Sequence, residues 1–146
     1  MRAICILNES AKLADHQRNA AAAIEAPYPL TRGEEYVIVG MLISEHTLYV
    51  LTEEDGGRPT LAPAGFFKEF DAEIPSHWCF ALQSGIHASG RRLWASPLVA
   101  TWGFPEMVNN PEYLSDLLLE GKIEALEAFR AEIAAGESRG CEGAEL

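Results

Sequence analysis

The stretch Tyr36-Val37-Ile38-Val39-Gly40-Met41-Leu42-Ile43 decides the fold class of this chain. It is rich in β-branched residues, which suit the pleated surface of a sheet, and it predicts one long strand. Gly40 inside it predicts a bulge or a sharp bend. Thr47–Thr52 predicts a second strand, and the acidic segment Glu53–Gly57 that follows contains the Asp-Gly signal of a hairpin turn.

The segments around this hairpin extend the β pattern in both directions. Ala3–Leu7 predicts a first strand, and Thr60–Ala62 predicts a short one that Pro63 ends. Gly65–Phe70 predicts a helical turn that packs its aromatic side chains inward. Several short strands joined by tight turns favour a small barrel.

Three motifs in this region resemble a known family. They are Leu30–Tyr36, Glu54–Gly56 and Pro63–Phe70. Together they are similar to a small SH3-like β-barrel family of bacterial proteins, with the pattern LTxGKxY, an acidic turn DDxG and a closing PxxLFE. Glu34 stands where lysine is usual, and Phe66 where leucine is usual. The resemblance implies an SH3-like core over about residues 28–72, and some members look like immunity proteins of toxin systems.

The segment after this core predicts an appended β-hairpin. Trp78–Leu82 and Leu93–Val99 have the apolar composition of strands, and the glycine-containing segment Gln83–Gly90 joins them. Pro97 has no backbone N–H to donate, so it marks an edge of the sheet or the end of pairing.

The last third of the chain predicts two helices over about residues 110–135. Asn109-Asn110-Pro111-Glu112 has the capping residues and the proline of a helix start. Gly121 predicts the end of the first helix. Apolar residues spaced by three and four between Ile123 and Ile133 predict the second, which Gly136 ends.

These elements predict a single α+β domain over residues 1–136. Residues 137–146 have almost nothing to bury, so we expect them to form a disordered tail. For residues 9–26 the sequence predicts either a loose helix or a loop. Four consecutive alanines favour a helix, but the apolar residues lack helical periodicity.

The charge of the chain limits its partners. The formal net charge is −11, and residues 106–146 carry 10 acidic and 3 basic residues. Binding to phosphates requires a basic surface, so nucleic acids and anionic membranes are not expected as partners. The acidic C-terminal third would attract a basic partner and speed its encounter. The alternative is that this charge serves solubility only.

The distribution of apolar residues and cysteines predicts a cytoplasmic protein. No apolar run approaches the roughly 18 residues needed to span a bilayer, and the short run Ala3–Leu7 is too brief for the core of a signal peptide. Cys5, Cys79 and Cys141 are odd in number and widely spaced. Free thiols in a reducing compartment are therefore expected.

No motif predicts catalysis, a metal site or a cofactor. His77 and Cys79 would lie on one face of a strand, but this spacing sets no geometry between base and nucleophile. A core cysteine beside a half-exposed histidine is the preferred interpretation. The enzymatic or small-ligand alternative would need Trp78, His77, Arg91 and Arg92 to converge in a cleft.

Two groups of residues are candidates for binding a partner. Glu53, Glu54 and Asp55 form an acidic hairpin tip, which is either simply solvated or an anchor for a basic partner. Trp102 and Phe104 precede the first predicted helix, where they either belong to the core or are partly exposed as interface anchors.

The function that these features favour is protein binding. We expect an immunity or inhibitor protein that neutralises a basic toxin enzyme or effector by direct binding. The alternatives are a small-ligand-binding or enzymatic domain with an unrecognised site, and a structural module. Self-association as a homodimer, through the edge at Pro97 or through the C-terminal helices, is also left open.

Overall fold

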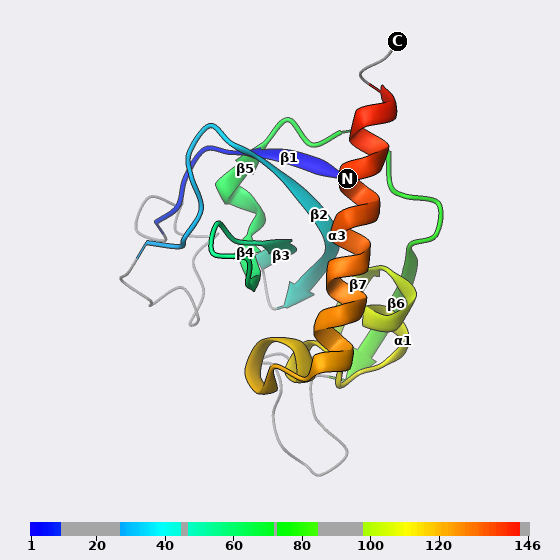
Figure 1. Ribbon diagram of the computed structural model, residues 1–146. Coiled ribbons are helices and arrows are strands. Elements are labelled where there is room, and N and C mark those ends of the chain that lie inside the picture. The colour runs from blue at the N-terminus through cyan, green and yellow to red at the C-terminus, as the bar shows by residue number, and fades with distance from the viewer. Residues whose placement is uncertain (10–26, 45–46, 72, 85–97, 144–146) are drawn as a thin grey trace.

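The computed structural model describes residues 1–9, 27–44, 47–71, 73–84 and 98–143, which form an antiparallel sheet and C-terminal helices (Figure 1). The strands are β1 (Arg2–Cys5), β2 (Glu35–Ser44), β3 (Thr47–Glu53), β4 (Pro59–Pro63), β5 (Phe67–Lys68), β6 (Cys79–Ser84) and β7 (Leu98–Gly103). The α+β class and the first four predicted strands are confirmed. Residues 9–26, predicted as helix or loop, lie outside the described part of the chain except for Glu9.

β2 is the central strand, and it divides into two halves. Its first half pairs with β1, with Arg2 opposite Val37. Its second half pairs with β7, with Met41 opposite Trp102. β3 runs along the other edge of β2, and nearly the whole length of β3 is paired with β2. β1 and β7 therefore follow one another along a single edge of the same strand.

The predicted SH3-like barrel is not confirmed, because the sheet is open. Along the main path the strand order is β4-β3-β2-β1-β5, so β4 and β5 stand at its two ends. In the described residues β4 and β5 do not pair with each other. The hairpin of β6 and β7 extends the sheet from the second half of β2.

A β-bulge in β2 allows both faces of the sheet to be buried. The pairing with β3 shifts between Ile38 and Gly40, so Val39 is the extra residue. Ile38 packs on one side, while Val39 and the position of Gly40 both face the helices. The predicted irregularity at Gly40 is confirmed. At the bulge the Thr52 hydroxyl donates a hydrogen bond of 2.7 Å to the carbonyl of Val37.

Two hydrophobic cores result, one on each side of β2 and β3. The helix-side core contains Val39, Leu42, Tyr49, Leu51, Phe104, Met107, Tyr113, Leu114, Leu117, Ala125, Phe129 and Ile133. The strand-side core contains Ala3, Cys5, Leu30, Tyr36, Ile38, Val50, Ala62, Phe66 and Phe67. The short 3-10 helix η4 (Ala64–Phe66) and β5 bring the last two aromatics inward, as the sequence predicted.

Two glycines bring the sheet close to the first helix. Gly40 and Gly103 are opposite each other on β2 and β7. A Cβ on Gly103 would lie 2.7 Å from the sulfur of Met107 and 3.0 Å from the Cα of Gly40. The absence of both side chains therefore makes the space that the buried Met107 occupies.

The predicted hairpin is present, and its second strand continues further along the chain than Val99, while residues 93–97 of the predicted strand lie outside the described residues. β7 begins at Leu98 and includes Trp102, which lies beyond the predicted strand Leu93–Val99. Phe104 is 0% exposed and packs edge-on against Tyr113 at 5.4 Å between ring centroids. Of the two alternatives left open for Phe104, the structure shows the core position and not the partly exposed anchor, because its side chain fills the helix-side core. Pro97 lies outside the described residues.

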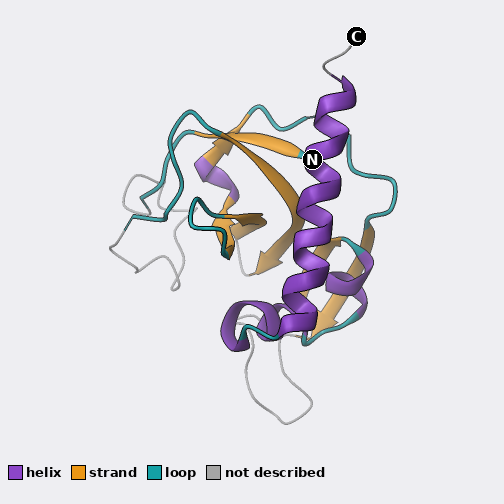
Figure 2. Cartoon of the chain, in the orientation of Figure 1, coloured by secondary structure: helices purple, strands orange, loops and turns teal. Residues whose placement is uncertain are grey.

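The C-terminal third is helical, but more of it is ordered than expected. It comprises α1 (Pro105–Asn109), α2 (Tyr113–Ser115), the π-helix η5 (Asp116–Glu120) and α3 (Ile123–Gly143). Gly121 has φ of 60° and ends η5, as predicted. α3 does not end at Gly136, so residues 137–143 are helical rather than a disordered tail. In Figure 2 this helix crosses the face of the sheet.

Gly136 lies inside α3 because of a close contact with β2. A Cβ at this position would lie 2.4 Å from Cγ1 of Val37. Glycine within a helix costs about 0.5–1 kcal/mol of stability relative to alanine. At this position the close packing on the sheet outweighs that cost.

We predict that Gly136→Ala changes the free energy of unfolding in opposite directions in the natural chain and in a Val37→Ala variant. In the natural chain the added methyl group should destabilise the protein by about 1–3 kcal/mol through overpacking. In a Val37→Ala background the obstructing methyl groups are gone, and the same change should stabilise by up to about 1 kcal/mol. Urea unfolding of the four variants measures both steps. A stabilising effect in both backgrounds would contradict the packing of α3 on Val37.

Candidate functional site

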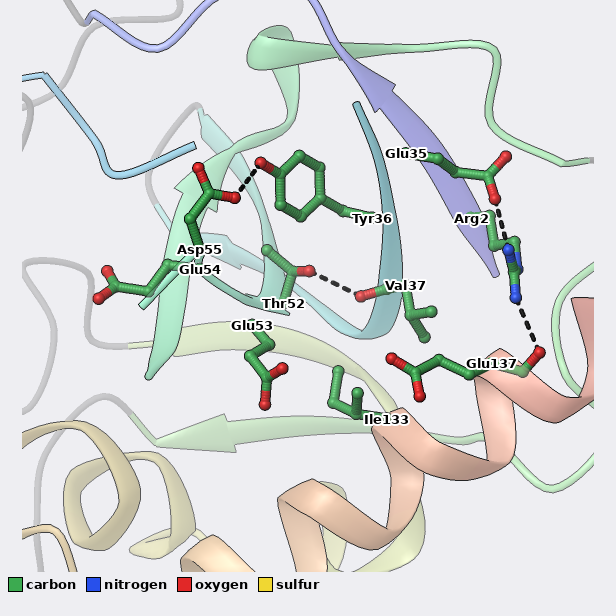
Figure 3. Close-up of a pocket in the computed structure, with 10 residues that line it drawn as sticks. All are labelled: Arg2, Glu35, Tyr36, Val37, Thr52, Glu53, Glu54, Asp55, Ile133 and Glu137. Carbon is green, nitrogen blue, oxygen red and sulfur yellow. Dashed lines mark hydrogen bonds and ion pairs between the residues drawn. The ribbon is translucent and has the colours of Figure 1, made fainter. Parts of the chain in front are cut away.

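A cleft of about 340 Å³ opens between the beginning of β2, the end of β3 and α3 (Figure 3). Five carboxylates and one guanidinium contribute to its walls, so the lining is predominantly negative. The residues are Arg2, Glu35, Tyr36, Val37, Thr52, Glu53, Glu54, Asp55, Ile133 and Glu137. It contains the predicted acidic hairpin tip, joined by residues from both ends of the chain.

Arg2 closes one end of the cleft and joins β1 to α3. Its guanidinium pairs with the Glu35 carboxylate. It also donates hydrogen bonds to the α3 carbonyl groups of Gly136, at 3.3 Å, and Glu137, at 2.9 Å. The cation of the cleft is therefore used within the chain, and so is the Glu35 carboxylate.

Asp55 is also committed to contacts within the chain. Its two carboxylate oxygens accept hydrogen bonds of 2.6 Å each, from the Thr31 hydroxyl and from the Tyr36 hydroxyl. The bonds from Thr31 and then Tyr36 lower the pKa of Asp55. Burial, and next the hydrogen bond to Asp55, raise the pKa of Tyr36. Asp55 thus ties the Pro29–Thr31 segment to the hairpin, and its backbone N–H donates to the Pro29 carbonyl at 3.0 Å.

The three remaining acidic residues of the cleft differ in whether their carboxylates already have an ion pair within the chain. The Glu54 carboxylate forms an ion pair with Arg58, with 3.2 Å between Oε1 and Nε. The Glu54 side chain is only 10% exposed. In the described residues the carboxylates of Glu53 and Glu137 have neither an ion pair nor a hydrogen bond. Figure 3 shows them on either side of the Ile133 side chain.

This arrangement suits a basic side chain. Lysine and arginine combine an aliphatic stem with a charged end, and they bury the stem along apolar surface. Val37 and Ile133 provide apolar surface in the cleft, and Glu53 and Glu137 provide negative charge beside it. The pair of unsatisfied carboxylates is thus the part of the cleft that an external cation would meet.

The five predicted partner-binding residues are not brought together. Glu53, Glu54 and Asp55 line the cleft, and only Glu53 among them has an unpaired carboxylate. Trp102 is half-buried on β7, where its ring contacts Phe80 with 4.9 Å between centroids. Phe104 is in the core, as described above.

Sequence reasoning missed Arg2, Glu35, Ile133 and Glu137 as parts of the site. Arg2 and Glu137 are separated by 135 positions, and no local motif joins them. The helical stripe that contains Ile133 predicted a buried face, but the sheet decides which residues border that face.

The residues considered for an enzymatic site do not converge on this cleft. His77 pairs through Nε2 with Glu132 of α3 at 2.8 Å. The Cys79 thiol lies 3.8 Å from the backbone carbonyl of His77. Arg91 and Arg92 lie outside the described residues. Within the described ranges, no group of three or more histidine, cysteine or acidic side chains is placed to hold a metal ion.

Comparisons of the chain with protein-family models, with curated proteins and with solved structures found no match. Among the helices in the part of the chain that the structure describes, none has both the length and the apolar character to cross a membrane.

We predict that Asp55→Asn destabilises the protein at neutral pH and much less in acid. The lowered pKa means that the folded state binds fewer protons than the unfolded state. The stabilisation is therefore present above the ordinary aspartate pKa of about 3.9, and it disappears as the pH falls through the lower folded value. Urea midpoints at pH 7 and in acid check this.

Glu34→Gln is the control for this experiment, because Glu34 is exposed and its side chain has no hydrogen bond or ion pair in the described residues. It should leave the pH profile unchanged. A constant difference between the natural chain and Asp55→Asn at both pH values would show that the ionised carboxylate is not what stabilises the hairpin.

Proposed function

We propose that this chain is a protein-binding protein that neutralises a basic toxin enzyme by holding one of its basic side chains in the acidic cleft. The observation that carries the proposal is the pair of unsatisfied carboxylates, Glu53 and Glu137, beside the apolar side chain of Ile133. Of these two, Glu53 is half-buried and Glu137 is exposed, and carboxylates without a cation would gain a charge-assisted contact from a lysine or arginine.

The surrounding charge supports a basic partner. The chain has a net charge of −11, and α3 exposes further carboxylates at Glu124 and Glu127. A negatively charged surface attracts a positively charged protein over a distance comparable with the Debye length, which is about 10 Å at 0.1 M ionic strength. Encounter with such a partner would be fast and would slow as salt is added.

The immunity role rests on the family resemblance of Leu30–Phe70. Thr31, Tyr36 and Asp55 all occur in the shared pattern, and they are hydrogen-bonded to one another. This contact supports the proposal that residues 28–72 are a divergent SH3-like unit, opened because β7 occupies an edge of β2. An immunity protein of this kind would act in the cytoplasm, where it meets its toxin.

The test uses the double variant Glu53→Gln/Glu137→Gln. The matched control is Glu124→Gln/Glu127→Gln, which removes the same formal charge from exposed positions outside the cleft. Tagged chains would be used for affinity capture from the chain's own organism at low and moderate salt. A captured basic protein would then be purified, and its affinity for each chain and its activity in their presence would be measured.

We expect the cleft variant to bind at least about tenfold more weakly, equivalent to about 1.4 kcal/mol, and the control to bind almost as the natural chain does. The captured enzyme should lose activity when the natural chain is added in equal amount. Equal binding by both variants would exclude the cleft as the interface. Binding without loss of activity would exclude the immunity role.

The small-ligand alternative is favoured by one observation, since a volume of about 340 Å³ is at the lower end for small-molecule sites. The mainly acidic lining would then select a small organic cation, such as a polyamine. Calorimetric titration with spermidine distinguishes this case, because binding that Glu53→Gln/Glu137→Gln abolishes, without any protein captured, would favour it.

A further inference from the structure

The face of the sheet that points away from the helices carries a row of exposed apolar side chains. The strand register places Phe80 beside Trp102, and Leu82 beside Ala100. Residues directly opposite each other in antiparallel strands project from the same face. Phe80 is 54% exposed and Leu82 is 62% exposed. Two large apolar side chains of β6 therefore stay largely exposed on this face.

β6 also differs from the other terminal strands of the sheet in lacking protection. β4 begins and ends with proline, and β5 is only two residues long and includes Lys68. Short length, proline and lysine are the usual devices that prevent an edge strand from pairing with another chain. β6 has the sequence Cys-Phe-Ala-Leu-Gln-Ser, which contains none of them, and in the described residues it pairs only with β7.

The backbone of β6 offers hydrogen bonds on its outer side. The Ala81 carbonyl accepts a bond of 3.4 Å from the Thr101 hydroxyl, so the backbone of Ala81 is directed toward β7. Backbone polar groups alternate in direction along a strand. The N–H and C=O groups of Phe80 and Leu82 therefore face outward, where an extended chain could pair with them.

We propose that β6 pairs in an antiparallel sense with β6 of a second copy of this chain. Such pairing about a twofold axis is self-complementary, since each copy presents the same edge to the other. With Ala81 opposite its counterpart, Phe80 of each copy lies opposite Leu82 of the other, and these are the residues whose backbone groups face outward. The two exposed side chains would then cover one another on the same face.

Charge selects a second copy over a basic partner at this edge. β6 has no ionisable side chain other than the thiol of Cys79, so two chains of net charge −11 would meet without like charges in the pairing strands. A basic protein would gain no opposite charge here. The cleft between β3 and α3 is formed by other elements, so this inference does not depend on the proposed function.

The first test is the mass of the full chain in solution, by sedimentation equilibrium over a range of concentrations. The natural chain should show a dimer that dissociates on dilution, and Leu82→Lys should be monomeric with an unchanged circular dichroism spectrum. Leu119→Lys is the matched control, because Leu119 is 78% exposed on η5, away from β6. It should dimerise as the natural chain does.

The second test checks the register. In a Cys79→Ala/Cys141→Ser background, Ala81→Cys should form a disulfide-linked dimer under mild oxidation, because opposite residues that are not hydrogen-bonded have Cα atoms about 4.5 Å apart. Phe80→Cys should not, since it lies opposite Leu82. A natural chain that is monomeric at all concentrations, a dimer that survives Leu82→Lys, or equal cross-linking at both positions would overturn the proposal.

Discussion

The structure depends on one long strand, β2, and on the bulge that divides it. Without the extra residue Val39, the two halves of the strand could not both present apolar side chains to the correct core. Ile38, before the bulge, lies in the strand-side core, whereas Leu42, four positions later, lies in the helix-side core. β1 and β7 share one edge of this strand, and the sheet stays open, with β4 and β5 at the ends of its main path.

Contacts between distant parts of the chain decide which charges remain available. Arg2 reaches α3 from the N-terminal strand, and Asp55 ties the hairpin to Thr31 and Tyr36. Both groups serve the fold, although each is an exposed or partly exposed ion in the cleft. Among the acidic residues that line the cleft, Glu53 and Glu137 remain for a partner, because contacts within the described part of the chain use the other three. A net charge alone could not identify these two.

The two proposed surfaces differ in chemistry and in position. The cleft combines unpaired carboxylates with a small apolar area, which suits a cation on a flexible side chain. The β6 edge combines outward backbone groups with Phe80 and Leu82, which suits another strand. Binding at the cleft should weaken strongly as salt is added, and pairing at the β6 edge should change little, since salt screens charges and does not reduce apolar burial. A dimer through β6 would leave both clefts free for partners.

The sequence by itself determined the features that depend on neighbouring residues. The strands of the hairpin, the irregularity at Gly40 and the end of η5 at Gly121 follow from β-branched composition and from the backbone freedom of glycine. Only the tertiary structure decided that the sheet is open, that Phe104 is buried, and that α3 continues past Gly136. The cleft belongs to this second group. Each of these features depends on a partner far along the chain, and local periodicity carries no information about which distant residues will meet.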